Sequence, residues 1–405
     1  MLSKITTFII RFLATFFQFF IVALISKQNN SEVLAFYFLY IAVHHIGSYI
    51  LNFGFERIAF ISISKNQNNF ISSVLEVFIN YFDVLKKKLY FFALLLLINI
   101  CLFNLSLIQC FLITLCSFLF SINLIASQSI VASSRTNIGV FFVRVFYLLI
   151  ISLILSYYIF FDINIGKQTI IYTFLLSVLI SIIACFIYIK FNYDTKNTQD
   201  SSIKIKLSYD QYKIQISNII FQRLPILLLN IFFSDKVTIA AFSLIHSFAS
   251  IRGTIVDILG AQLTPKFLNI YENNKNTFYL KEYFGKIQFF TVIINVIYGA
   301  TILAFGNYIL NFFNPDFTEY FNILVIYICG NIVLSFFGLS IFLNSNISIK
   351  NSNHIKNIIM SISSMIILCF ILNKYFEIEG LVIGVLISQL LLSFLSIKNI
   401  WKLLS

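Results

Sequence analysis

The residues of this sequence best suited to binding chemistry are its arginines. They are scarce, and five of the six fall inside long apolar segments: Arg11, Arg57, Arg144, Arg223 and Arg252. A guanidinium group stays charged at any relevant pH, and its planar fork donates paired hydrogen bonds to phosphate oxygens. Guanidinium groups gathered within apolar segments therefore predict a site for an anion that carries phosphate.

The cost of these arginines leaves two explanations open. An arginine at the centre of a membrane helix costs about 2.5 to 3.5 kcal/mol, so the five are not expected to face lipid. Long side chains near a helix end can instead reach the membrane surface, or they can pair with an acid inside the protein. The other explanation is a polar cavity that several helices share.

Polar residues at helical spacing accompany four of these arginines, which favours the cavity. The four groups are Thr7, Arg11, Thr15 and Gln18; His45, Ser48, Asn52 and Glu56 beside Arg57; Asn218, Gln222, Arg223 and Asn230; and Ser243, Ser247, Ser250, Thr254 and Asp257 near Arg252. Such stripes either bond helices to one another or line a cavity. We expect Gln18, Asn52 and Ser250 to line the cavity.

Two acids lie in the same stripes. Glu56 and Asp257 are candidates for carrying a coupling proton or sodium ion. The alternative is that they pair with Arg57 and Arg252.

The composition defines the elements that hold these residues. Of the 405 residues, 59% are hydrophobic and 11% are charged, whereas soluble domains are about 25% charged. A membrane-spanning helix needs about 20 mostly apolar residues. Segments of this kind occur at 6–26, 34–63, 89–107, 109–133, 137–160, 168–191, 213–234, 237–260, 286–310, 319–344, 354–373 and 379–398. The expected fold is an all-α integral membrane protein with about twelve transmembrane helices.

The net charge of +12 is explained by lysines in alternate loops. They concentrate in the polar stretches 64–88, 192–212 and 261–285, and loops rich in lysine and arginine stay cytoplasmic. We therefore expect both termini in the cytoplasm and no nucleic-acid partner.

The six cysteines show no metal-ligand spacing, so we expect them to pack as small apolar residues, with no metal and no cofactor.

The stripes also predict an internal repeat. The first and second segments each carry an arginine, as do the seventh and eighth. Two six-helix lobes, 1–200 and 201–405, would then surround one central cavity.

The end of the second segment, Asn52-Phe-Gly-Phe-Glu-Arg57, and the arginine of the first resemble the polysaccharide and O-antigen flippases. These form the lipid-linked oligosaccharide branch of the multidrug/oligosaccharidyl-lipid/polysaccharide exporter superfamily. The resemblance implies a bacterial inner-membrane transporter that carries an undecaprenyl-diphosphate-linked repeat unit, of O-antigen or capsule type, to the outer leaflet. It implies association with glycan polymerase and chain-length machinery in lipopolysaccharide synthesis. It points to Arg11, Arg57 and Arg252 as headgroup contacts, with Arg223 and Arg144 behind them.

The sequence leaves two other functions open. A multidrug or metabolite antiporter of the same superfamily is disfavoured, because a cation carrier should have acidic rather than basic residues in its cavity. A membrane glycan polymerase or O-acyltransferase would need His44, His45 or His246 as a base. The sequence has no hydrolase, zinc or nucleotide motif, so we expect no enzyme and no catalytic residue.

Overall fold

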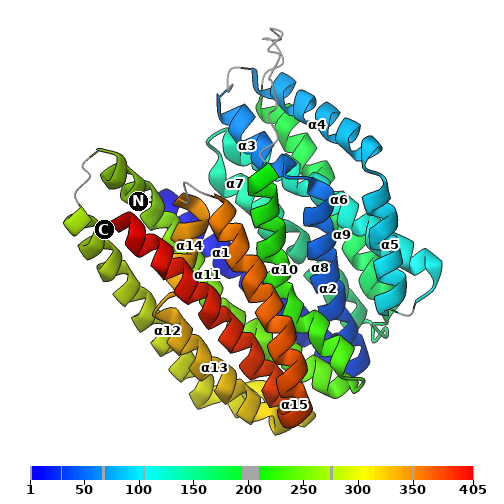
Figure 1. Cartoon of the computed structure of the whole chain (residues 1–405). Helices are drawn as coiled ribbons and strands as arrows, with labels where there is room; N and C mark the ends of the chain where they lie inside the picture. The colour runs from blue at the N-terminus through cyan, green and yellow to red at the C-terminus, as the bar shows by residue number, and fades with distance from the viewer. Residues whose placement is uncertain are drawn as a thin grey trace. The chain divides into compact units, whose positions relative to one another are not determined.

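The computed structural model describes residues 2–28, 30–65, 69–103, 105–193, 209–273, 277–347 and 351–404. Every regular element in these ranges is a helix (Figure 1). By their internal contacts the helices form two units, Met1–Ile219 and Ile220–Ser405. The division falls inside α10, whereas the predicted boundary at 200/201 lies in the polar stretch 194–208, outside the described residues. The lobes 1–200 and 201–405 stay a prediction.

Unit 1 is built around α6. Its helices are α1 (Leu2–Ser26), α2 (Ser31–Asn52), α3 (Phe55–Lys65), α4 (Phe70–Lys87), α5 (Tyr90–Phe103), α6 (Leu107–Ala132), α7 (Thr136–Phe141), the π-helical turn η2 (Phe142–Phe146), α8 (Tyr147–Phe160), α9 (Lys167–Asn192) and the start of α10 (Tyr209–Phe232). α6 packs against α2, α3, α5, α7 and α9, and most of its residues are buried.

The second predicted segment, 34–63, is two helices rather than one. Phe53 and Gly54 separate α2 from α3, with φ values of 51° and 80°. A bulky residue such as phenylalanine rarely adopts a positive φ, so surrounding contacts must hold it there. Asn52 supplies one of them, because its Oδ1 accepts the backbone N–H of Glu56 at 3.0 Å.

The polar stretch 64–88, expected as a loop, contains α4. Its apolar residues Phe70, Val74, Val77 and Tyr81 follow helical spacing and are buried. This face packs on α3, and the Tyr81 hydroxyl lies 2.7 Å from the Ser121 hydroxyl of α6. A helix with one apolar face on a core is stabilised by that packing, whatever its overall polarity.

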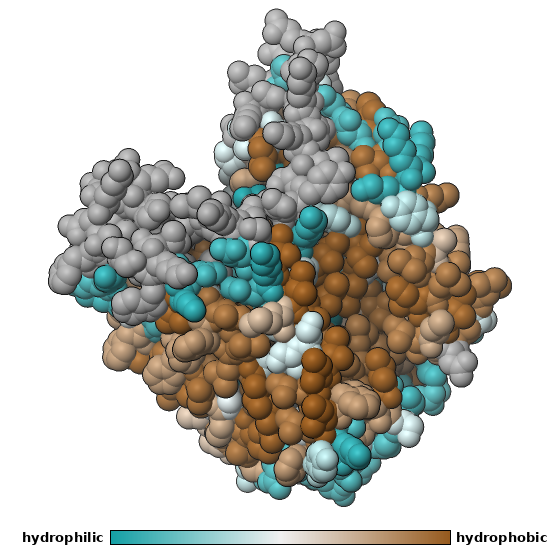
Figure 2. All heavy atoms as spheres, viewed as in Figure 1, coloured by the Kyte–Doolittle hydropathy of each residue, from teal (hydrophilic) through white to brown (hydrophobic). Residues whose placement is uncertain are grey.

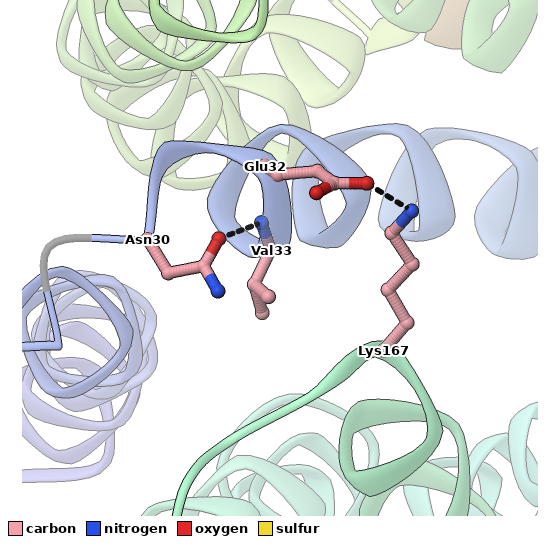
Figure 3. Close-up of polar contacts among 4 residues, drawn as sticks. All are labelled: Asn30, Glu32, Val33 and Lys167. Carbon is pink, nitrogen blue, oxygen red and sulfur yellow. Dashed lines mark hydrogen bonds and ion pairs between the residues drawn. The ribbon is translucent and has the colours of Figure 1, made fainter.

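Side-chain contacts join the turn between α1 and α2 to the turn between α8 and α9. Lys167 forms an ion pair with Glu32 at 2.5 Å, next to the Asn30 side chain that caps α2 by accepting the N–H of Val33 (Figure 3). Gln28 adds two hydrogen bonds to the backbone at Ile163 and Ile165. An exposed ion pair by itself contributes about 0 to 1 kcal/mol to stability. The two hydrogen bonds of the Gln28 amide add to this contribution.

Unit 2 is built from longer helices. They are the rest of α10, α11 (Lys236–Asn273), α12 (Thr277–Phe313), the 3-10 helix η3 (Pro315–Tyr320), α13 (Phe321–Ser335), α14 (Gly338–Ile347) and α15 (Asn351–Leu404), which is interrupted at Phe376 and Glu377. The stretch 261–285, expected as a loop, is helical except at 274–276, which lie outside the described residues. Asp235 caps α11, and hydrogen bonds from Thr238 hold the pKa of its carboxyl below the usual value.

The described helices confirm an all-helical, multi-pass integral membrane protein. Ten of them are long and apolar enough to span a membrane. The shorter apolar helix α5 matches the third predicted segment, and the break in α15 separates the last two. Apolar side chains cover the sides of the helices in Figure 2, as expected for surfaces that face lipid.

Candidate functional site

In unit 1 the predicted residues lie on four segments, α1, α2, α3 and η2. Arg11 and Gln18 belong to α1, which packs against α7, η2 and α8. Arg144 lies in the π-helical turn η2 and is exposed. Single π-helical turns within α-helices are frequent at functional sites. Arg11 is half-buried and Gln18 is exposed, so Arg144 and Gln18 are accessible from outside unit 1.

Glu56 gives unit 1 a buried acid near two of the predicted arginines. It is 8% exposed and lies within electrostatic range of Arg57 and Arg144. Arg57 is itself exposed, with its guanidinium 5.9 Å from the centre of the Phe60 ring. The structure thus brings together two predicted arginines and one predicted acid from α3 and η2.

Asn52 is held within the fold of unit 1. Its Nδ2 donates to the backbone oxygen of Ser121 at 3.3 Å, and its Oδ1 accepts from Glu56 N. Both ends of the amide therefore have protein partners, and they fix the joint between α2 and α3 against α6.

In unit 2 two predicted arginines border one buried pair. His246 Nδ1 and the Tyr327 hydroxyl are 2.7 Å apart, and both residues are at least 93% buried. Arg223 of α10 interacts electrostatically with His246, and Arg252 of α11 with Tyr327. Each member of this buried pair is thus within electrostatic range of one predicted arginine.

Arg252 of α11 is partly buried. Its Nε and Nη1 are buried, and the described residues offer them no acceptor. Asp257 is exposed and interacts with Arg252 electrostatically. Ser250, the other predicted residue of α11, is exposed and donates its hydroxyl to the Ser247 carbonyl.

Several hydroxyls of the polar stripes bond to their own helices. Thr15 donates to the carbonyl of Arg11, Ser48 to that of His45, and Ser247 to that of Ser243. Serine and threonine within helices commonly bond back in this way. The spacing of these hydroxyls therefore does not by itself identify a cavity. The side chain of Thr7 lies outside the described residues.

Sequence reasoning missed a polar face on α12. Gln288, Thr291, Asn295 and Tyr298 follow one another at spacings of three, four and three, which places them on one face. Gln288 donates to the Ser335 carbonyl of α13, and Tyr298 to the Phe248 carbonyl of α11. The spacing of these residues is visible in the predicted segment 286–310, but no arginine accompanies them there.

The two units share one aromatic arrangement. The rings of Tyr40 and His44 stack at an interplanar angle of 4°, and so do those of Phe242 and His246. These histidines pack in aromatic surroundings, and the described residues contain no group of three His, Cys, Asp or Glu that could hold a metal ion.

Comparison with known proteins identifies the fold. No protein-family model matches the sequence, and no curated protein matches it either. Among solved structures, an inward-facing multidrug resistance MATE family transporter of the MOP superfamily matches with a TM-score of 0.74 at 13% identity, over 99% of this chain and 98% of that one. An outward-facing MATE transporter matches with a TM-score of 0.66 at 12% identity, over 99% and 95%.

A further match is the lipid II flippase MurJ in an inward closed conformation. Its TM-score is 0.69 at 15% identity, over 98% of this chain and 87% of that one. These three solved structures are transporters rather than enzymes. At these identities the likeness establishes the fold: this chain has the two-lobed, all-helical architecture of the MATE transporters and MurJ.

Proposed function

We propose that this protein transports an undecaprenyl-diphosphate-linked oligosaccharide from the inner to the outer leaflet of the bacterial inner membrane. The observation that carries the proposal is the placement of five of its six arginines on helices of a transporter fold, Arg11, Arg57 and Arg144 in unit 1 and Arg223 and Arg252 in unit 2. Anionic phosphate suits such a set, because each guanidinium can bind two of its oxygens. The match to a structure named as a lipid II flippase supports a lipid-linked substrate.

In the proposed mechanism the two lobes alternate around a shared basic cavity. The diphosphate and the sugars enter from the cytoplasm, while the lipid tail stays in the bilayer. Arg11, Arg57 and Arg252 bind the diphosphate, with Arg223 and Arg144 behind them. Gln18 and Ser250 line the cavity, and Glu56 or Asp257 carries a coupling ion. The glycan polymerase and chain-length machinery receive the product.

The second candidate is a multidrug or metabolite antiporter, which the match to a multidrug MATE transporter favours. A cationic cargo would be repelled by the arginines of both units. The basic residues therefore favour the lipid-linked anion.

Substituting the arginines tests the proposal. In proteoliposomes with a defined undecaprenyl-diphosphate oligosaccharide, we expect Arg11→Ala and Arg252→Ala to reduce flipping at least about tenfold, since each loses a charged hydrogen bond worth about 1.5 to 3 kcal/mol. Arg11→Lys and Arg252→Lys should retain part of the activity, because lysine keeps the charge but not the fork.

The control is Arg135→Ala, which removes the sixth arginine. Arg135 is exposed and donates hydrogen bonds to Tyr188 and Asn192 where α9 ends, and it is not among the proposed headgroup contacts. All variants are compared at equal amounts of folded protein. Full flipping by both alanine variants would rule out the proposed headgroup contacts.

A further inference from the structure

Three helices of unit 2, α11, α12 and α13, line a cavity of about 10 Å³. Its lining includes Arg252 of α11, Asn295 and Tyr298 of α12, and Asn331 of α13. This volume is near the lower limit for one water molecule, and a buried water needs two to four polar partners. The residues that line the cavity include both hydrogen-bond donors and acceptors.

Two residues that line this cavity have complementary buried polar atoms. Nε and Nη1 of Arg252 are donors for which the described part of the chain offers no acceptor. Oδ1 of Asn295 is an acceptor, and no donor reaches it from the same residues. The orientation of the amide is set, because its Nδ2 donates to the Thr291 carbonyl at 2.7 Å. Leaving such atoms unpaired in a protein interior is unfavourable.

We propose that one water molecule occupies this cavity, accepts a hydrogen bond from the Arg252 guanidinium and donates one to Asn295 Oδ1. Through this water, Asn295 is a positioning residue that holds Arg252 towards α12. A chloride ion suits the cavity less well, because Asn295 Oδ1 requires a donor. The role of Arg252 in transport rests on the proposed function, whereas the water and the contact with Asn295 do not.

The position of the guanidinium can be read from its reactivity, without any transport substrate. The purified full-length protein is treated with phenylglyoxal, and modification of Arg252 is followed by mass spectrometry of its peptide. Asn295→Leu removes the acceptor and should raise the rate about fivefold, which is what one hydrogen bond of ordinary strength corresponds to. Asn295→Asp supplies a carboxylate and should lower the rate below that of the unaltered protein.

The matched control is Asn307→Leu, the same substitution at an exposed position of the same helix, which should leave the rate unchanged. Equal rates in Asn295→Leu, Asn295→Asp and the unaltered protein would overturn the positioning role. If Asn295→Leu does not fold, the aspartate variant still decides, since a role in packing alone would not slow modification of Arg252.

A density map of the unaltered protein at about 2 Å tests the water directly. A peak between the Arg252 guanidinium and Asn295 Oδ1 is expected, and a direct contact between the two side chains would overturn the bridging water. Failure of the flipping assay with the expected modification rates would reject the proposed function while the Asn295 contact stands. Unchanged rates with normal flipping would reject the contact alone.

Discussion

Tyr327 is the residue at which the buried polar groups of unit 2 meet. Its hydroxyl bonds to His246, its ring lies edge-on to both His246 and Phe242, and it interacts electrostatically with Arg252. A buried histidine whose partner is removed keeps its desolvation cost and loses its hydrogen bond. Tyr327 therefore links the stability of α13 to the positions of His246 and Arg252 on α11.

We expect Tyr327→Phe to lower the stability of the protein by about 1 to 3 kcal/mol, because it leaves a buried ring nitrogen without its hydrogen bond. The change keeps the ring and removes one oxygen. Thermal unfolding in detergent measures the effect. Tyr308→Phe, at a tyrosine of α12 that is 77% exposed, should unfold at the same temperature as the unaltered protein. An unchanged midpoint for Tyr327→Phe would show that the hydrogen bond contributes no net stability.

At the scale of elements, the joint between α2 and α3 depends on Gly54. Its φ is +80°, and a Cβ added there would lie 3.2 Å from Cβ of Tyr212 at the start of α10. The Tyr212 hydroxyl also donates to the Ile50 carbonyl at 2.9 Å. The joint is thus fixed both by its backbone conformation and by α10.

Gly54→Ala should destabilise the protein by about 1 to 2 kcal/mol, the cost of placing an L-residue in this region of backbone conformation, plus the close contact with Tyr212. The midpoint of thermal unfolding measures it. The control is Gly285→Ala in α12, where an added Cβ meets nothing within 4 Å and alanine favours the helix. A midpoint for Gly54→Ala equal to that of Gly285→Ala would mean that the joint adapts without cost.

Hydropathy predicted the spanning helices but not the elements that depend on contacts. The run 34–63 is apolar on both sides of Gly54, and average hydropathy contains no information about a φ of +80°. The helix α4 was missed because its lysines and acids outweighed the helical spacing of Phe70, Val74 and Val77. The arginines were identified because they are scarce, whereas Asn295 and Tyr327 depend on which helices pack together.

At the scale of the whole molecule, alternate loops differ in charge, and this predicts the orientation in the membrane. Lysines are abundant in the segments expected to be cytoplasmic. The turn between α8 and α9, around Asp162, and η3 after Asn314 belong to the segments expected outside.

Reporter fusions test this orientation. Alkaline phosphatase, which is active only outside the cytoplasm, should be active when fused after Asp162 or Asn314 and inactive when fused after Arg135. Green fluorescent protein fused after the last residue should fluoresce, since it folds in the cytoplasm. The opposite pattern at all four positions would reverse the topology and place the entrance to the proposed cavity on the other side.

The path of α10 has a consequence for how the chain could be divided. Tyr212 packs on Gly54 and bonds to Ile50 within unit 1, while Arg223, three turns further along the same helix, lies near His246 in unit 2. If the chain were cut within 194–208, the second fragment would keep α10. The first turn of that helix contains Tyr212, which contacts Gly54 and Ile50 of the first fragment. Two fragments produced separately should therefore associate through these contacts without a covalent link.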